Sequence, residues 1–242
     1  MANQKTIEPI EVNLYCGANP KLEKFFNQFT LIVDWFRLAA EKLTLKHHID
    51  HHTDLVKFLL SEERKQWHNP QTILNEIGIT KGMIIADLGS GPGFFTMPMA
   101  EMIGENGLLY AVDSSKTMLK DLKENIAKSE VNPNIIKIVN SDVCHTGIPK
   151  ESVDLVFFAN FLHEVEDKKE FFQEVRRITK PTAYIVDVDW KKIQTEHGPP
   201  FKLRLSEDEA KRVLAENGFF AIKQIDKGPY HYELICKPTA NS

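Results

Sequence analysis

Alternation of two kinds of segment is the clearest pattern in this chain. Short apolar runs rich in Ile, Val and Leu have the length and composition of buried parallel strands. Between them, apolar residues recur every three or four positions, as on one face of a helix. This alternation predicts an α/β fold with helices packed on a mostly parallel sheet. The expected strands are residues 83–86, 108–113, 135–139, 153–159, 183–190, 219–226 and 230–237, and the expected helices between them are 93–103, 115–129, 166–179 and 206–217.

The first 68 residues precede this pattern. Apolar residues recur at helical spacing from Leu22 to Leu43, after a cap-and-proline helix start at Asn19. This helix either packs on the core as an extra element or forms a lid or a homodimer contact, and both alternatives stay open. A second cap-and-proline pair begins at Asn69. We therefore expect a helical extension, 1–68, followed by an α/β domain, 69–242.

Composition restricts the class of protein. With 242 residues, 42% of them hydrophobic and 26% charged, the chain is long enough for one α/β domain with extra helix. A net charge of −4 gives no electrostatic footprint for nucleic acid or an acidic membrane. No apolar run reaches the roughly 18 residues of a membrane span. The start of the chain lacks the pattern of a signal peptide, and its three scattered cysteines fit a reducing cytoplasm. We expect a cytoplasmic protein.

Residues 83–96 combine a buried strand, a glycine-rich turn and the start of a helix. Asp87 ends the apolar run, and Gly89, Gly91 and Gly93 follow at alternate positions. Glycine lets the backbone turn sharply and lets a ligand approach without a Cβ in the way. Backbone N–H groups at the start of a helix favour polar or negatively charged groups. The segment predicts a site for a polar ligand.

The glycine spacing narrows the class of ligand. A dinucleotide site needs G-x-G-x-x-G, and Phe94 stands where the third glycine would be required. A Walker A loop needs Lys-Ser or Lys-Thr after its glycines, and neither pair is present. A carboxylate at Asp87 is badly placed beside a phosphate. A carboxylate with a glycine loop instead suits a ligand that carries an ammonium group.

Acids follow the next two strands. Asp113 lies 20 residues after Gly93, where an acid can accept hydrogen bonds from both hydroxyls of a ribose. Ser114 or Ser115 can cap the helix that follows, so Asp113 is not needed as a cap. After the third strand, Asp142 is either a ligand contact or a turn residue.

The fourth strand leads into a polar rim. Ligands of open α/β sheets bind beyond the carboxyl ends of the strands, so Asn160 and His163 face the expected site. His163 titrates near neutral pH when unperturbed and is a candidate general base. The alternative is a histidine that only binds a loop carbonyl. Asp187 and Asp189 share one face of the fifth strand.

The glycine segment Asp-Leu-Gly-Ser-Gly-Pro-Gly from Asp87, together with Asp113 and Asp142, resembles the motifs of class I S-adenosylmethionine (SAM)-dependent methyltransferases. The resemblance extends from about Asn69 to Pro238. It implies a Rossmann-like doubly wound sheet of seven strands, mostly parallel with an antiparallel last strand. The rim from Asn160 to Val165 is similar to that of the quinone-biosynthesis C-methyltransferases and arsenite methyltransferases.

The resemblance implies SAM as cofactor and a role for each motif residue. In the family the glycine loop wraps the methionine end of the cofactor, the second acid binds the ribose, and the third acid with its neighbour binds the adenine. The cofactor contacts carried over are Asp87, Gly89, Ser90, Gly91, Gly93, Asp113, Ser114, Asp142, Val143 and Asn160.

The expected function is methyl transfer to a small-molecule acceptor by direct in-line displacement. Two alternatives stay open: a SAM-binding regulatory or scaffold protein without transfer activity, and a nucleotide-dependent oxidoreductase. Loop 191–205 is long enough to serve acceptor access.

Three further features allow a functional and a structural interpretation. Arg64 either reaches the cofactor carboxylate or is a surface charge on a helix. The histidines at positions 47, 48, 51 and 52 have metal-ligand spacing, but no second cluster is evident and we expect no metal site. Cys144 is either a reactive thiol or a small packed residue.

Overall fold

The computed structural model describes residues 51–195 and 198–239. All of them belong to a compact unit that spans Lys46–Ser242. The expected helix between Leu22 and Leu43 lies outside the described residues, as do His47 and His48. None of the described helices is long and apolar enough to cross a membrane.

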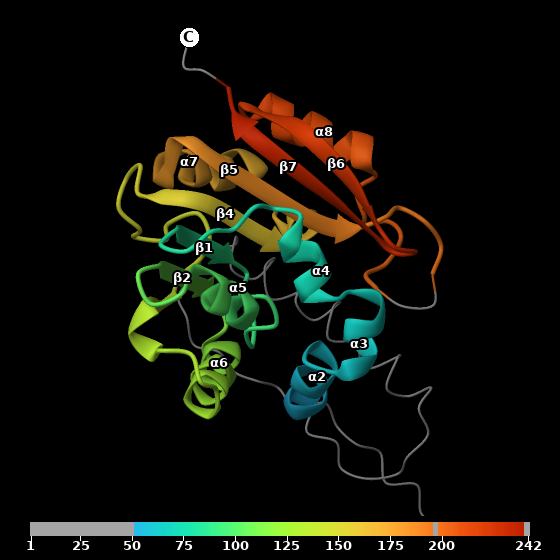
Figure 1. Ribbon diagram of the computed structural model, residues 1–242. Helices are drawn as coiled ribbons and strands as arrows, with labels where there is room; N and C mark the ends of the chain where they lie inside the picture. Colours follow the sequence, from blue (N-terminus) through green and yellow to red (C-terminus); the bar gives the residue numbers. More distant parts are fainter. Residues whose placement is uncertain (1–50, 196–197, 240–242) are drawn as a thin grey trace, which may run out of the picture. The chain divides into compact units, whose positions relative to one another are not determined.

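A seven-stranded sheet organises the unit (Figure 1). Its order is β3-β2-β1-β4-β5-β7-β6, and the pairs among β1 to β5 are parallel. β7 runs antiparallel to both β5 and β6, as expected for the last strand. The strands are β1 (Ile84–Leu88), β2 (Leu108–Asp113), β3 (Ile136–Asn140), β4 (Val153–Ala159), β5 (Thr179–Trp190), β6 (Phe219–Lys227) and β7 (His231–Pro238).

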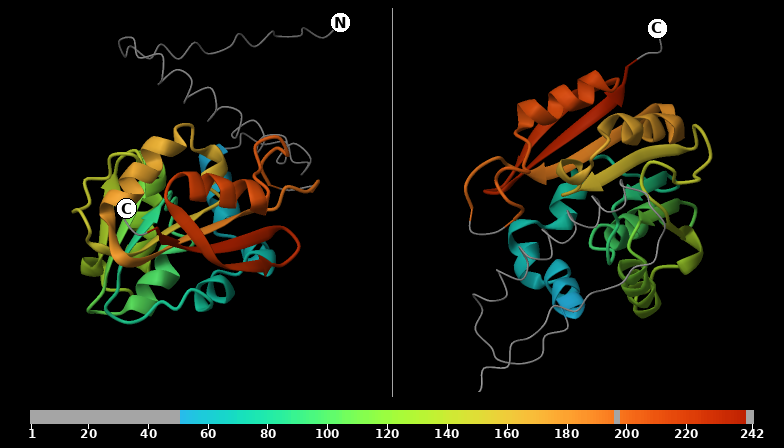
Figure 2. Two further views of the ribbon diagram at one scale, coloured as in Figure 1. Left: turned by 90° about the horizontal axis from the view of Figure 1, so that it is seen from above. Right: turned by 180° about the vertical axis from the view of Figure 1, so that it is seen from behind.

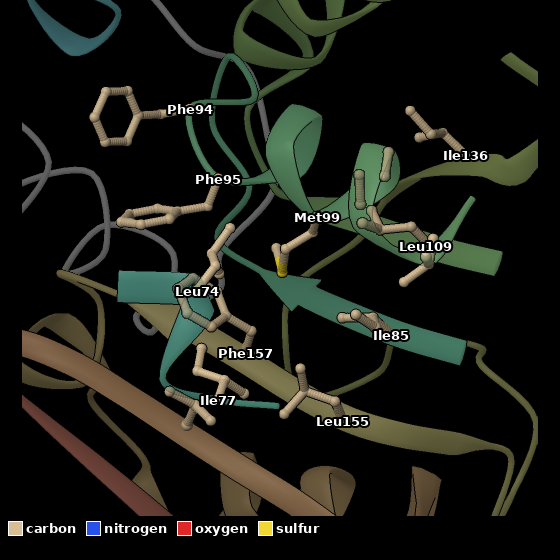
Figure 3. Close-up of a cluster of buried hydrophobic side chains, with 14 of the residues drawn as sticks. Leu74, Ile77, Ile85, Phe94, Phe95, Met99, Leu109, Ile136, Leu155 and Phe157 are labelled. Atoms are coloured by element: carbon tan, nitrogen blue, oxygen red, sulfur yellow. The ribbon is translucent and has the colours of Figure 1, made fainter. Parts of the chain in front are cut away.

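Helices cover both faces of the sheet, and Figures 1 and 2 show α7 and α8 on one side with α4 and α5 on the other. Side chains alternate between the faces along each strand, so Ile85 and Ala86 of β1 enter different cores. Figure 3 shows the core beneath α4 and α5, where Met99 and Leu74 pack on Ile85 and Phe157. The helices are α2 (His51–Leu59), α3 (Glu62–Trp67), α4 (Pro70–Asn75), α5 (Thr96–Ile103), α6 (Lys116–Lys128), α7 (Lys168–Ile178) and α8 (Glu207–Glu216), with 3-10 turns η1 (Pro133–Ile135) and η2 (Leu162–Glu164).

Local signals place most helix starts correctly. Asn69 caps α4, Ser115 caps α6, and Ser206 forms a capping box with Glu209 at α8. One expected start is wrong: α5 begins at Thr96 rather than at residue 93. Gly93 has φ +100°, which is incompatible with a right-handed helix.

Helices α2 and α3, which come from the expected N-terminal extension, contact the α/β domain. His52 Nε2 of α2 lies 2.6 Å from Asp121 Oδ2 of α6. The Arg64 guanidinium of α3 lies 4.0 Å from the centre of the Phe94 ring. The histidine segment therefore contributes a contact between helices, and the described residues contain no group of three or more possible metal ligands.

The loop after β3 is anchored to α7 through one buried carboxylate. Glu174 accepts hydrogen bonds from Thr146 N at 2.9 Å and from Arg177 Nε at 2.6 Å. Arg177 Nη2 also donates to the Ile148 carbonyl at 2.6 Å. Burial alone would raise the pKa of Glu174, but the bonds from Arg177 and Thr146 lower it overall. The carboxylate therefore fixes the loop that begins with Asp142.

Replacing this anchor tests its contribution to stability. Glu174→Gln weakens the bonds from Thr146 and Arg177, and we expect a loss of about 1–3 kcal/mol in the free energy of unfolding at pH 7. The folded state lowers the pKa of Glu174, so the ionised carboxylate stabilises the fold. This stabilisation is complete above the unfolded pKa of about 4.3 and is lost as pH falls through the folded pKa. Urea denaturation at pH 7 and pH 4 measures both effects. Glu166→Gln, an exposed glutamate nearby, is the control, and equal losses in the two variants would contradict the prediction.

Candidate cofactor site

The glycine turn after β1 is held against the end of β2. Gly89 N and Ser90 N both donate to the Val112 carbonyl, at 2.9 and 3.0 Å. The three glycines have φ values of +80°, +53° and +100° in chain order, the left-handed region that glycine adopts readily. The turn therefore depends on glycine at each of these positions.

The three glycines serve different contacts. A Cβ on Gly89 would lie 2.7 Å from the Phe161 ring, and one on Gly93 would lie 2.6 Å from Leu122 Cδ1. These two glycines let neighbouring side chains pack against the turn. A Cβ on Gly91 meets nothing within 4 Å among the residues that the structure describes. Gly91 therefore leaves an open backbone surface that a ligand can approach.

Asp113 joins the glycine turn to α6. Its Oδ2 accepts a hydrogen bond from Gly91 N at 2.8 Å, and its Oδ1 accepts one from Ser115 N at 2.8 Å. Burial raises the pKa of Asp113, and the two amide donors oppose that shift. Each carboxylate oxygen keeps a lone pair for a further donor. The structure therefore supports a hydroxyl-accepting role and adds a scaffolding role that the sequence did not indicate.

Asp87 is a buried acid at the end of β1. The residue is 3% exposed, and Thr96 Oγ1 donates to Asp87 Oδ2 at 2.6 Å. Burial raises its pKa to about 7, against the opposing effect of the Thr96 hydrogen bond. A cation placed at this carboxylate would restore the ionised form. The site chemistry therefore fits a ligand with an ammonium group.

Two buried polar atoms near the turn have no hydrogen-bond partner among the described residues, Ser90 Oγ and Asn160 Oδ1. Asn160 has φ +55°, unusual for a residue other than glycine, and its backbone N donates to the Val188 carbonyl at 2.7 Å. Buried polar groups are normally paired, so these two atoms retain hydrogen-bonding capacity next to the turn that a ligand could use.

The loop after β3 lies next to Asp113. Asn140 Nδ2 donates to the carbonyls of Asp113 and Ser114, at 3.1 and 2.9 Å. Asp142 is exposed, and its Oδ1 accepts from Cys144 N at 3.0 Å. Val143 is half-buried. The adenine contacts expected at Asp142 and Val143 stay predictions. Both residues follow Asn140, which contacts the backbone of the expected ribose acid Asp113.

Burial raises the pKa of the Cys144 thiol to about 11, and nearby carboxylates add to the shift. A thiolate is therefore scarce near neutral pH. Cys144 packs on the core that α7 and α8 cover, as expected for a small packed residue.

His163 is buried beneath the rim and held by Asp189 of β5. Its Nδ1 lies 2.8 and 2.9 Å from the two carboxylate oxygens of Asp189, and its side chain is 2% exposed. Burial alone would lower its pKa, but the charge and hydrogen bond of Asp189 raise it overall. Its role as a general base stays a prediction, and the loop-carbonyl alternative does not match this carboxylate partner.

Arg64 is 7% exposed, which excludes the surface-charge interpretation. Its Nη1 donates to the Leu59 carbonyl at 2.9 Å, and no ion pair with a carboxylate occurs among the described residues. Burial lowers its pKa to about 9. A buried cation of this kind is stabilised by an anion, so Arg64 suits a carboxylate on a ligand.

An aromatic column that the sequence did not predict runs from the glycine turn to β7. The rings of His68 and His231 stack with centroids 3.9 Å apart, His68 packs edge-on to Phe95, and Trp190 lies 4.3 Å from His231. Burial lowers the pKa of both histidines, and the charge of Arg64 lowers both further. The column consists of neutral rings beside a buried cation.

Arg204 organises loop 191–205. It donates to the carbonyls of Pro199 and Ile193, at 2.8 and 2.9 Å, and to Thr195 Oγ1 at 2.6 Å. Its guanidinium also lies 5.0 Å from the Trp190 ring centre. These contacts hold the described parts of the loop, 191–195 and 198–205, together beyond the end of β5.

Comparison with known proteins gives consistent matches. A family profile described as "Methyltransferase domain" matches residues 86–186. Demethylmenaquinone methyltransferase of Staphylococcus aureus is 28% identical over 125 residues, which are 52% of this chain and 49% of that protein. The chain thus matches about half the length of these curated relatives.

Solved structures share the fold. A SAM-dependent methyltransferase from Aquifex aeolicus has a TM-score of 0.73 and 28% identity, over 77% of this chain and 98% of that one. Phosphoethanolamine N-methyltransferase 2 of Haemonchus contortus, in complex with SAM, has a TM-score of 0.58 at 14% identity, over 72% of this chain and 53% of that one. The sheet order, the glycine turn with its two acids and these matches together support a SAM-dependent methyltransferase of class I.

Proposed function

We propose that this protein binds SAM at the carboxyl ends of β1, β2 and β4 and transfers the methyl group to a small-molecule acceptor. The observation that carries the proposal is the open backbone at Gly91, flanked by the two desolvated carboxylates Asp87 and Asp113. When bound, SAM supplies a methyl group activated by a sulfonium leaving group. The protein then has mainly to hold donor and acceptor in line.

Side chains of opposite charge contact the segment at the start of α5, where the methionine end is expected. Asp87 contacts Thr96, and Arg64 lies over Phe94, two residues earlier in the chain. We assign the ammonium group to Asp87 and the carboxylate to Arg64. At the other end, Asp113 accepts the ribose hydroxyls and the loop at Asp142 holds the adenine.

The acceptor belongs to the class of small molecules. The S. aureus relatives are named for demethylmenaquinone, so reduced demethylmenaquinone is the first acceptor to test, beside simple phenols and amines. A scaffold protein that binds SAM without transfer is the main competing function. Such a scaffold protein would need the glycine turn to bind SAM but would need no binding site for a methyl acceptor.

Calorimetric titration with S-adenosylhomocysteine and with NADH tests the cofactor assignment. We expect S-adenosylhomocysteine to bind and NADH to bind far more weakly, because Phe94 replaces the third glycine of a dinucleotide site. Transfer of labelled methyl from SAM to the acceptor panel then tests activity. Tighter binding of NADH overturns the proposal, and binding without turnover on any acceptor favours the scaffold function.

The pH dependence of binding tests the role of Asp87. Because its pKa in the free protein is about 7, Asp87 must lose a proton before it can pair with the ligand ammonium. We expect the affinity for S-adenosylhomocysteine to rise from pH 5.5 to 7.5, by up to about tenfold per pH unit below the pKa. In Asp87→Asn this rise disappears. An unchanged pH profile in the variant would contradict the assignment.

Gly91→Ala and Gly93→Ala form a matched pair that separates binding from folding. A Cβ at Gly91 meets no atom of the described part of the chain within 4 Å, so we expect the variant to lose only about 1 kcal/mol of stability, from its left-handed backbone. Its methyl group occupies the space assigned to the cofactor, so affinity falls at least about tenfold, or 1.4 kcal/mol. Gly93→Ala adds a close contact with Leu122 and loses more stability. Unchanged cofactor affinity in Gly91→Ala would contradict the open-backbone argument.

A further inference from the structure

Glu164 ends the 3-10 turn that follows β4, next to the glycine turn. Its backbone N donates to the Phe161 carbonyl at 2.9 Å, and the Phe161 ring packs against Gly89. The glutamate is therefore held on a rim segment that touches the expected methionine end of the cofactor site.

The Glu164 side chain is partly exposed to solvent, yet its carboxyl group is desolvated. It keeps 35% of its surface exposed, while burial of its carboxyl raises the pKa to about 7. The charge of His163 opposes this rise, and Asp189 and Asp113 add to it. The carboxyl is thus partly desolvated and partly exposed, and it is close enough to Asp113, the expected ribose acid, for the two charges to interact.

The buried His163 side chain is the neighbour of this carboxyl group. Its Nε2 lies 3.7 Å from Glu164 Oε1, and its Nδ1 is held by Asp189. The His163 side chain is 2% exposed, so it offers far less surface to an acceptor than Glu164 does. Lys168, whose Nζ donates to the Val165 carbonyl at 2.7 Å, adds a positive charge on the same side. The histidine can thus stabilise a charge on Glu164 without touching a substrate.

We propose that Glu164 takes the proton from the methyl acceptor, with His163 and Asp189 as positioning residues behind it. This inference rests on the proposed methyl transfer. The acceptor atom forms a bond to the methyl carbon as the carbon–sulfur bond breaks and its electron pair stays on sulfur. The proton of the acceptor passes to the Glu164 carboxylate and from there to solvent. The acceptor class is therefore a molecule with an ionisable O–H, N–H or activated C–H.

Sinefungin tests the proposal without an identified acceptor. This SAM analogue carries an amine in place of the transferred methyl group, whereas S-adenosylhomocysteine has neither. We expect Glu164→Gln to lower the affinity for sinefungin at least about tenfold, since it removes a charged partner. Affinity for S-adenosylhomocysteine stays within about twofold of the wild type. Glu166→Gln, an exposed glutamate on the same segment, is the control and leaves both affinities unchanged.

The ratio of the two affinities also reports ionisation of Glu164. In the wild type, binding of sinefungin relative to S-adenosylhomocysteine strengthens as pH rises from 6 to 8, and titration of Asp87 cancels because both ligands carry the same amino-acid end. His163→Gln shifts the midpoint of this change to higher pH, because the charge of His163 lowers the pKa of Glu164. An unchanged ratio in Glu164→Gln overturns the inference and leaves the cofactor assignment intact. Failure of the wild type to bind S-adenosylhomocysteine overturns the proposed function itself.

Discussion

The geometry of the candidate site depends on one carboxylate that joins two loops. Asp113 accepts the amide of Gly91 with one oxygen and the amide of Ser115 with the other. A turn with three glycines has large conformational freedom, so its shape must be imposed from outside. Asp113 imposes it at the point where the ribose is expected. The same group therefore organises the turn and lies at the proposed ligand site.

Two buried charges of opposite sign lie near this turn. Asp87 and Arg64 are both buried, and no ion pair between either and another described residue occurs. Desolvation disfavours the charged form of each, which raises one pKa and lowers the other. A ligand with an ammonium and a carboxylate would stabilise both at once. A phosphate would meet one favourable and one unfavourable charge, which is a physical reason to exclude nucleotides.

The fold was predictable because its signals are local. Caps at Asn69 and Ser115 and the short apolar strands are properties of a few adjacent residues. Asp113 and its distance from the glycines were equally readable. The burial of Arg64 and the stack of His68 on His231 were not, because they depend on segments 163 positions apart in the chain. A short sequence motif cannot predict a contact between residues so far apart in the chain.

The rim after β4 shows how tertiary structure redistributes chemistry between neighbours. An isolated histidine titrates near neutral pH and an isolated glutamate does not, so the sequence favours His163 as the base. In the fold Asp189 engages His163 and raises its pKa, while burial moves Glu164 to about 7. The reachable group with a near-neutral pKa is then the glutamate. Proton transfer requires both access and a suitable pKa, and at this rim exposure and a near-neutral pKa coincide at Glu164 rather than at His163.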